Sequence, residues 1–197
     1  MRLSKIPFAV FLTIAIAVIA GATGAWTHRL SPDLYDRFGY STRDLWDGRP
    51  WTLLTAIFLT GRPAMTWIII FFAPVSIGVY EWLVGTRRAL FVFFFGDLAA
   101  TLAVSLLVIL PLQLAGVGLG AEMEASRDVG MSAGGFAAMG GVIALAPGRW
   151  RLGLIAVVFA LIALKTSFVP ELVADLVHVF GVSLGFGAQR WLARKTP

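Results

Sequence analysis

Two stretches, Asp128-Val-Gly-Met-Ser-Ala-Gly-Gly-Phe136 and Ala174-Asp-Leu-Val-His-Val-Phe-Gly-Val-Ser-Leu-Gly185, indicate both the fold and the chemistry of this chain. Each places one reactive side chain, Ser132 or His178, in an otherwise nearly apolar helical segment. Polar groups inside a membrane are costly and usually functional. We therefore take Ser132 and His178 as a candidate nucleophile and base, with chemistry inside a bilayer as the first hypothesis.

The composition indicates an integral membrane protein. Of 197 residues, 58% are hydrophobic and only 14% are charged, and the mean hydropathy is +0.84. No soluble domain of this length needs so much apolar surface. The formal net charge of +5 is explained by basic residues at helix ends, without a nucleic-acid partner.

Apolar stretches that are long enough to cross a bilayer recur along the chain. They lie at about 6–26, 64–84, 89–112, 131–146, 152–168 and 171–192. The pattern predicts an all-α polytopic membrane protein, a single membrane domain over 1–197 with six transmembrane helices. The first stretch also has features of a signal peptide, but its apolar run is longer than a usual signal core, so we expect a retained helix.

The longer connections differ in character. Residues 27–63 mix aromatic and charged side chains, which favours an interfacial segment in contact with the lipid bilayer; a plain covering loop is the alternative. Within it, 51–60 is apolar but too short to span, as expected of an interfacial or partly re-entrant helix. A Gly-rich acidic loop is expected between the third and fourth spans, through Gly120, Glu122, Glu124 and Asp128.

Basic residues predict the orientation. If the amino terminus is cytoplasmic, nine of the sixteen Lys and Arg residues fall in the termini and inner loops with almost no acidic neighbours. The positive-inside rule then places both termini in the cytoplasm. The nine are Arg2, Lys5, Arg87, Arg88, Arg149, Arg151, Arg190, Arg194 and Lys195.

Ser132 follows the acidic loop where the fourth helix is expected to begin. A serine hydroxyl needs a base within hydrogen-bond reach, and histidine is the commonest one. Unpaired N–H groups at a helix amino terminus suit an oxyanion, and Gly130 allows a close turn there. Small residues, Gly181 and Gly185 on the last helix among them, would let this helix press its His178 face against the fourth.

These features resemble the rhomboid family of intramembrane serine proteases. Gly130-Met131-Ser132-Ala133 is similar to the family's Gly-x-Ser-Gly motif, and His178 with Gly181 and Gly185 to its His-x-x-Gly-x-x-x-Gly pattern. The segments 80–85 and 48–58 resemble the end of the second helix and the entry to the core. The resemblance implies a six-helix bundle in which Ser132 attacks a peptide bond of a transmembrane substrate. His178 would act as base and then acid, and Gly130, Met131 and Ala133 would support the oxyanion.

Two departures point to a divergent, actinobacterial-type branch. The family's His and Asn on the second helix are missing from 64–70, where Thr66 is the one candidate substitute, and Ala133 replaces the second motif glycine. The alternative function is therefore a rhomboid pseudoprotease that binds transmembrane helices as adaptor, chaperone or membrane-complex subunit. A purely structural hydrogen bond between two helices is the simplest reading of Ser132 and His178.

The remaining polar residues are expected to have separate roles. Asp175 shares a helix face with His178 and is either an orienting acid or a hydrated group near the helix start. Asp97 should face the bundle interior, either with a partner such as the Ser76 hydroxyl or as a protonated carboxyl. His28 is expected in the interface. With two histidines and no cysteine, we expect neither a protein-bound metal nor a cofactor.

Overall fold

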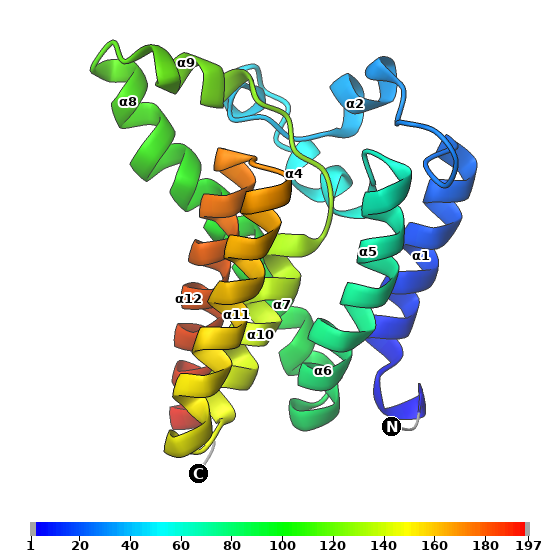
Figure 1. Ribbon diagram of the computed structural model, residues 1–197, viewed down its shortest axis with the longest axis vertical. Helices are drawn as coiled ribbons and strands as arrows, with labels where there is room; N and C mark the ends of the chain where they lie inside the picture. Colours follow the sequence, from blue (N-terminus) through cyan, green and yellow to red (C-terminus); the bar gives the residue numbers. More distant parts are fainter. Residues whose placement is uncertain (1–2, 196–197) are drawn as a thin grey trace.

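A computed structural model describes residues 3–195, and all regular elements in this part of the chain are helical. Figure 1 shows the long helices side by side, with short helices gathered at one end. We call this the loop end, and the opposite end, where the described chain begins and finishes, the terminal end. The α-helices are α1 (Pro7–Thr23), α2 (Pro32–Phe38), α3 (Arg43–Trp46), α4 (Thr52–Thr55), α5 (Pro63–Ala73), α6 (Val79–Val84), α7 (Thr86–Val104), α8 (Leu110–Leu114), α9 (Gly118–Ala125), α10 (Ser132–Leu145), α11 (Gly148–Phe168) and α12 (Leu172–Lys195).

Four continuous helical segments are long and apolar enough to cross a membrane. They are Pro63–Val84, Thr86–Leu114, Gly148–Phe168 and Leu172–Lys195. The first two join neighbouring α-helices through the π turns Pro74–Gly78 and Ser105–Ile109. At the first of these, Pro74 lacks the N–H that would continue the ordinary helical ladder.

Six transmembrane helices were expected, and the structure shows four helical segments of spanning length. Helices also form at the first and fourth predicted spans, but α1 has 17 residues and α10 has 14, short of a full crossing. Figure 1 shows why α10 is short: the chain from α9 runs down into the bundle before α10 begins. Ser132, the first residue of α10, therefore lies within the bundle.

Helix α10 is the centre of the bundle, packed between α7 and α12. Its glycines and alanines are almost all buried. A Cβ built on Gly185 of α12 would lie 1.9 Å from the Ala137 carbonyl oxygen, and one on Gly140 would lie 2.1 Å from that of Val182. Only glycine fits at these two crossings, so small residues set the distance between α10 and α12.

Helix α11 is peripheral by comparison. Only 11% of its most apolar stretch is buried, against 39–44% in the other three spanning segments. Its buried residues Val158 and Ile162 pack with Phe136, Ile143 and Val182 of α10 and α12. The remaining surface of α11 is available to lipid.

A buried glutamate ties α1 to the terminal end. Glu81 accepts hydrogen bonds from the backbone N–H groups of Phe8 and Ala9, at 3.0 and 2.8 Å, and from the Thr86 hydroxyl at 2.8 Å. It thereby satisfies the free donors at the start of α1. The described chain begins and finishes at this same end (Figure 1).

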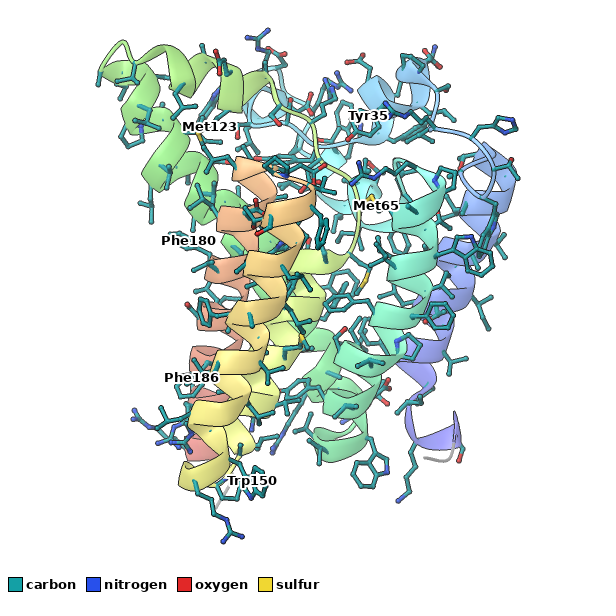
Figure 2. The ribbon with its side chains drawn as sticks, viewed as in Figure 1. Tyr35, Met65, Met123, Trp150, Phe180 and Phe186 are labelled. Atoms are coloured by element: carbon teal, nitrogen blue, oxygen red, sulfur yellow. The ribbon has the colours of Figure 1, made fainter. Side chains whose placement is uncertain are left out.

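The loop end is more ordered than the sequence suggested. The expected acidic loop contains the helix α9, and 27–63 carries three short helices besides a 3-10 turn at Ala56–Phe58. Buried Asp44 pairs with Arg127 at 2.8 Å and with Arg49 at 3.4 Å, which joins the two connections. Figure 2 places Tyr35 at the loop end and Trp150 at the opposite end.

Candidate functional site

Ser132 and His178 meet inside the bundle. The Ser132 Oγ lies 2.8 Å from the His178 Nε2, so that the first residue of α10 is hydrogen-bonded to the second turn of α12. His178 is 4% exposed, and its ring lies beside Phe136 with 4.6 Å between ring centroids. The pair has the separation that proton transfer from a hydroxyl to an imidazole requires.

The chain before Ser132 is held by backbone contacts with the loop end. Tyr40 and Asp128 exchange two backbone hydrogen bonds of 3.0 and 2.8 Å, and the Gly130 N–H donates to the Ala56 carbonyl at 2.8 Å. Gly130 has a φ of +117°, and a Cβ there would lie 2.6 Å from the Met65 methyl carbon. Glycine is therefore required at 130, for its backbone angle and for space.

Free backbone donors remain next to the serine. Within residues 3–195, no hydrogen-bond acceptor is found for the N–H groups of Ser132 and Ala133, which open α10. The next donor, Gly134 N–H, is occupied by Asp97 Oδ1 at 2.9 Å. Met131, which precedes Ser132, is fully buried. The two free N–H groups stand where an oxyanion formed at Ser132 would need donors.

The prediction that Ser76 is a partner of Asp97 was wrong. Asp97 bonds the backbone of α10, whereas the Ser76 hydroxyl donates to the Phe72 carbonyl of its own helix at 2.7 Å. Serine in a helix can satisfy its hydroxyl this way, which removes the need for a distant carboxylate. Asp97 thus fixes the start of the helix that carries Ser132.

Asp175 is not hydrogen-bonded to His178. Its carboxylate accepts from the Lys165 ammonium at 2.7 Å and from the Glu171 N–H at 3.3 Å, and Lys165 also pairs with Glu171 at 3.0 Å. The His178 Nδ1 is buried and has no hydrogen-bond partner in the described part of the chain. The geometry is that of a Ser-His pair without a third member.

Ser132 and His178 lie between a pocket and a cleft. On one side is a narrow pocket, the inner pocket, where the polar side chains of Tyr40, Asp97, Thr101, Ser105 and Asp128 lie among apolar ones. On the other is an open cleft of about 930 Å³, the lateral cleft, between α5, α10, α11 and α12. Ser132, His178 and Asp128 line both spaces. A segment lying in the lateral cleft would thus contact Ser132 directly.

The α5 wall of the lateral cleft is apolar. It is formed by Met65, Ile68, Ile69 and Phe72, and Figure 2 shows Met65 near the loop end of α5. Thr66, the expected substitute donor, is turned away: its hydroxyl bonds Thr60 at 2.6 Å and the Ala25 carbonyl at 3.0 Å. The second helix therefore supplies no side-chain donor to the oxyanion region.

Asp128, which the sequence places at the end of the acidic loop, lies at the site. Burial raises its pKa to about 6, and the nearby Glu171 carboxylate adds to the shift; the Val129 N–H, Lys165 and Asp175 contribute smaller effects. Its Oδ1 accepts from the Val129 N–H at 2.8 Å. No sequence spacing reveals this placement, because Asp128 is brought to the pocket by the turn at Gly130.

The other candidates lie elsewhere. His28 is exposed and bonded to Thr27 at 2.8 Å, and it lines neither space. Within residues 3–195, no three His, Cys, Asp or Glu side chains are grouped so that they could hold a metal ion.

Comparisons of the chain with protein-family models, with curated proteins and with solved structures gave no match.

Proposed function

We propose that this chain is a rhomboid-like intramembrane serine endopeptidase of the bacterial plasma membrane, with Ser132 as nucleophile and His178 as general base. The single observation that carries the proposal is the 2.8 Å separation of Ser132 Oγ and His178 Nε2 beside two free N–H groups. A structural hydrogen bond alone needs neither free donors nor a cleft on each side of the pair.

The reaction needs no cofactor. His178 Nε2 takes the Ser132 hydroxyl proton while Oγ bonds to the carbonyl carbon of the scissile peptide. The oxyanion of the tetrahedral intermediate is held by the N–H groups of Ser132 and Ala133, with Gly130 and Met131 fixing the turn beneath them. When the C–N bond breaks, His178 gives its proton to the leaving amine. Water then attacks the acyl ester with His178 again as base.

The substrate class follows from the position of the lateral cleft. It opens between α5 and α11, both of which present apolar side chains outward, and α11 is the least buried of the spanning segments. A transmembrane segment of another protein would enter from the bilayer by this route. Because helical amides are hydrogen-bonded internally, the segment must unwind at the bond that is cut, which favours substrates with helix-breaking residues.

One observation favours a second function, a pseudoprotease that holds a transmembrane helix without cutting it. The α5 wall is apolar throughout, so the oxyanion would lack a side-chain donor from that helix. Loss of one such donor typically costs roughly 100- to 1000-fold in rate. In this function the lateral cleft is a binding groove, and the chain is an adaptor, chaperone or complex subunit.

A fluorescent fluorophosphonate probe separates the two functions, because it labels only an activated serine. Labelling of the detergent-purified protein is expected, and it should vanish in Ser132→Ala and in His178→Ala. Ser183→Ala is the matched control, since Ser183 lies on α12 with its hydroxyl bonded to its own helix.

The outcomes are distinct. Labelling that persists in Ser132→Ala would place the reactive group elsewhere. No labelling of correctly folded wild-type protein would favour the pseudoprotease, and co-purification of helical membrane partners would then be the next measurement.

A further inference from the structure

We propose that an anionic phospholipid binds the outer face of α7 and α12 at the terminal end, with an acyl chain in a groove and its phosphate between Arg87 and Lys195. This site lies apart from Ser132 and does not depend on the proposed function.

The groove lies between α7 and α12, with about 630 Å³ of empty space. Phe91 and Phe95 line it from α7, and Ser183, Gly187 and Trp191 line it from α12. A Cβ built on Gly187 would meet no atom within 4 Å, so nothing in the described chain fills this space. An apolar groove on a membrane-spanning surface is bathed by lipid tails, so an acyl chain is its natural occupant.

The aromatic wall is preformed. Phe91 and Phe95 are stacked with 5.5 Å between ring centroids and 8° between planes, and Phe91 lies 6.3 Å from the ring of Trp191. Rigid aromatic rings provide a large contact area with little loss of conformational entropy when a chain binds. Trp191 lies one turn before the end of α12, and tryptophan near the end of a spanning helix usually meets lipid headgroups.

The positive charges at the terminal end of the groove favour an anionic lipid headgroup. Helices α7 and α12 are antiparallel, because Phe91 meets Trp191 near one end while Val104 and Val177 share a cluster near the other. Arg87 precedes Phe91 by one turn and Lys195 follows Trp191 by one turn, so both cations continue the groove walls to the terminal end. The Lys195 ammonium lies 3.7 Å from the Trp191 ring centroid. Both residues are exposed, and together they complement a phosphate diester.

The test measures binding of phosphatidylglycerol and phosphatidylcholine with identical acyl chains to the detergent-purified protein, by native mass spectrometry. Phosphatidylglycerol is expected to bind more tightly. The double variant Arg87→Gln/Lys195→Gln should lower its affinity by about 20-fold and leave phosphatidylcholine nearly unchanged. The matched control, Lys5→Gln/Arg149→Gln, removes two exposed cations from the same end, at the starts of the described chain and of α11, neither of which lines the groove.

A second variant tests the acyl chain. Gly187→Leu fills the groove and should weaken both lipids by about tenfold, whereas Gly153→Leu, at an equally open glycine of α11, should not. Equal affinity for the two lipids, or equal losses in the charge variant and its control, would overturn the proposal. So would a dimer that Gly187→Leu dissociates without affecting lipid binding, because the groove would then hold a second copy. If Gly187→Leu fails to fold, the charge variants alone decide.

Discussion

The His178 imidazole is held by the Ser132 hydroxyl at Nε2 and by the Phe136 ring, and its Nδ1 has no partner in the described chain. In serine proteases with a triad, an acid at this nitrogen fixes the tautomer, and its loss costs about 10⁴-fold in kcat. The structure instead commits Asp175 to Lys165.

We therefore predict that Asp175→Asn keeps fluorophosphonate labelling within about tenfold of the wild-type rate, far from the loss of a triad acid. The variant should instead lower the thermal stability, because the bridge to Lys165 ties α11 to α12. The labelling rate and the melting temperature are measured on the same preparation. A loss of labelling as large as that of His178→Ala, at unchanged stability, would assign Asp175 to the catalytic group.

Asp128 makes stability depend on pH. Its pKa is raised from the ordinary 3.8 to about 6, so the folded protein binds this proton more tightly than the unfolded chain does. The resulting stabilisation is complete below about pH 4 and is lost as the pH rises through 6. We predict that Asp128→Asn is more stable than wild type above pH 6, by roughly 1–3 kcal/mol, with no advantage at pH 4.

Unfolding in denaturant at pH 4, 5, 6 and 7 measures this difference. Asp47→Asn is the control, because it removes an exposed carboxylate from the same end of the molecule. If the difference between Asp128→Asn and wild type is the same at pH 4 and pH 7, Asp128 does not titrate in this range.

At the residue scale, the sequence pointed to Ser132 and His178 as a pair but not to the contacts of the polar residues around them. Ser132 and His178 stood out because polar groups are rare in apolar helices. The bond of Asp97 to Gly134 and the turning of Thr66 toward Ala25 depend on helix rotation and depth. Neither is encoded in a local pattern.

At the scale of elements, hydropathy located every long helix within a few residues, because lipid and core both require continuous apolar segments. The helix α9 was missed, since Gly118–Ala125 has no apolar face long enough to distinguish it from a loop. Hydropathy did not predict the depth at which α10 begins. It is set by the contact of Gly130 with Ala56, 74 positions apart in the chain, and not by the composition of α10.

The close crossing of α10 and α12 leads to an element-scale prediction. Gly185→Ala should cost several kcal/mol, because its Cβ would lie 1.9 Å from the Ala137 carbonyl oxygen and force the helices apart. Gly187→Ala, two residues along the same helix, has open space and should be neutral or slightly stabilising. Unfolding of both variants in one detergent measures the contrast. Equal stabilities would mean that the two helices are not in tight contact.

At the scale of the whole molecule, the same end of the bundle holds both ends of the described chain and a group of basic residues. The described chain begins and finishes at the terminal end, where Arg87, Arg149 and Lys195 also lie, and the acidic and aromatic segments gather at the loop end (Figure 1). The lateral cleft opens in the half nearer the loop end, since Arg62, Lys165 and Glu171 line it. A substrate would thus be cut near the outer face if the terminal end is cytoplasmic.

This orientation can be tested directly because the chain has no native cysteine. Ser126→Cys places a thiol at an exposed site of the loop end, and Gly148→Cys places one at an exposed site of the terminal end. A membrane-impermeant maleimide added to intact bacterial cells should label Ser126→Cys, and should label Gly148→Cys only after the cells are opened. The reverse pattern would put the loop end in the cytoplasm. It would leave the Ser132–His178 geometry unchanged but move the cut to the inner end of the substrate helix.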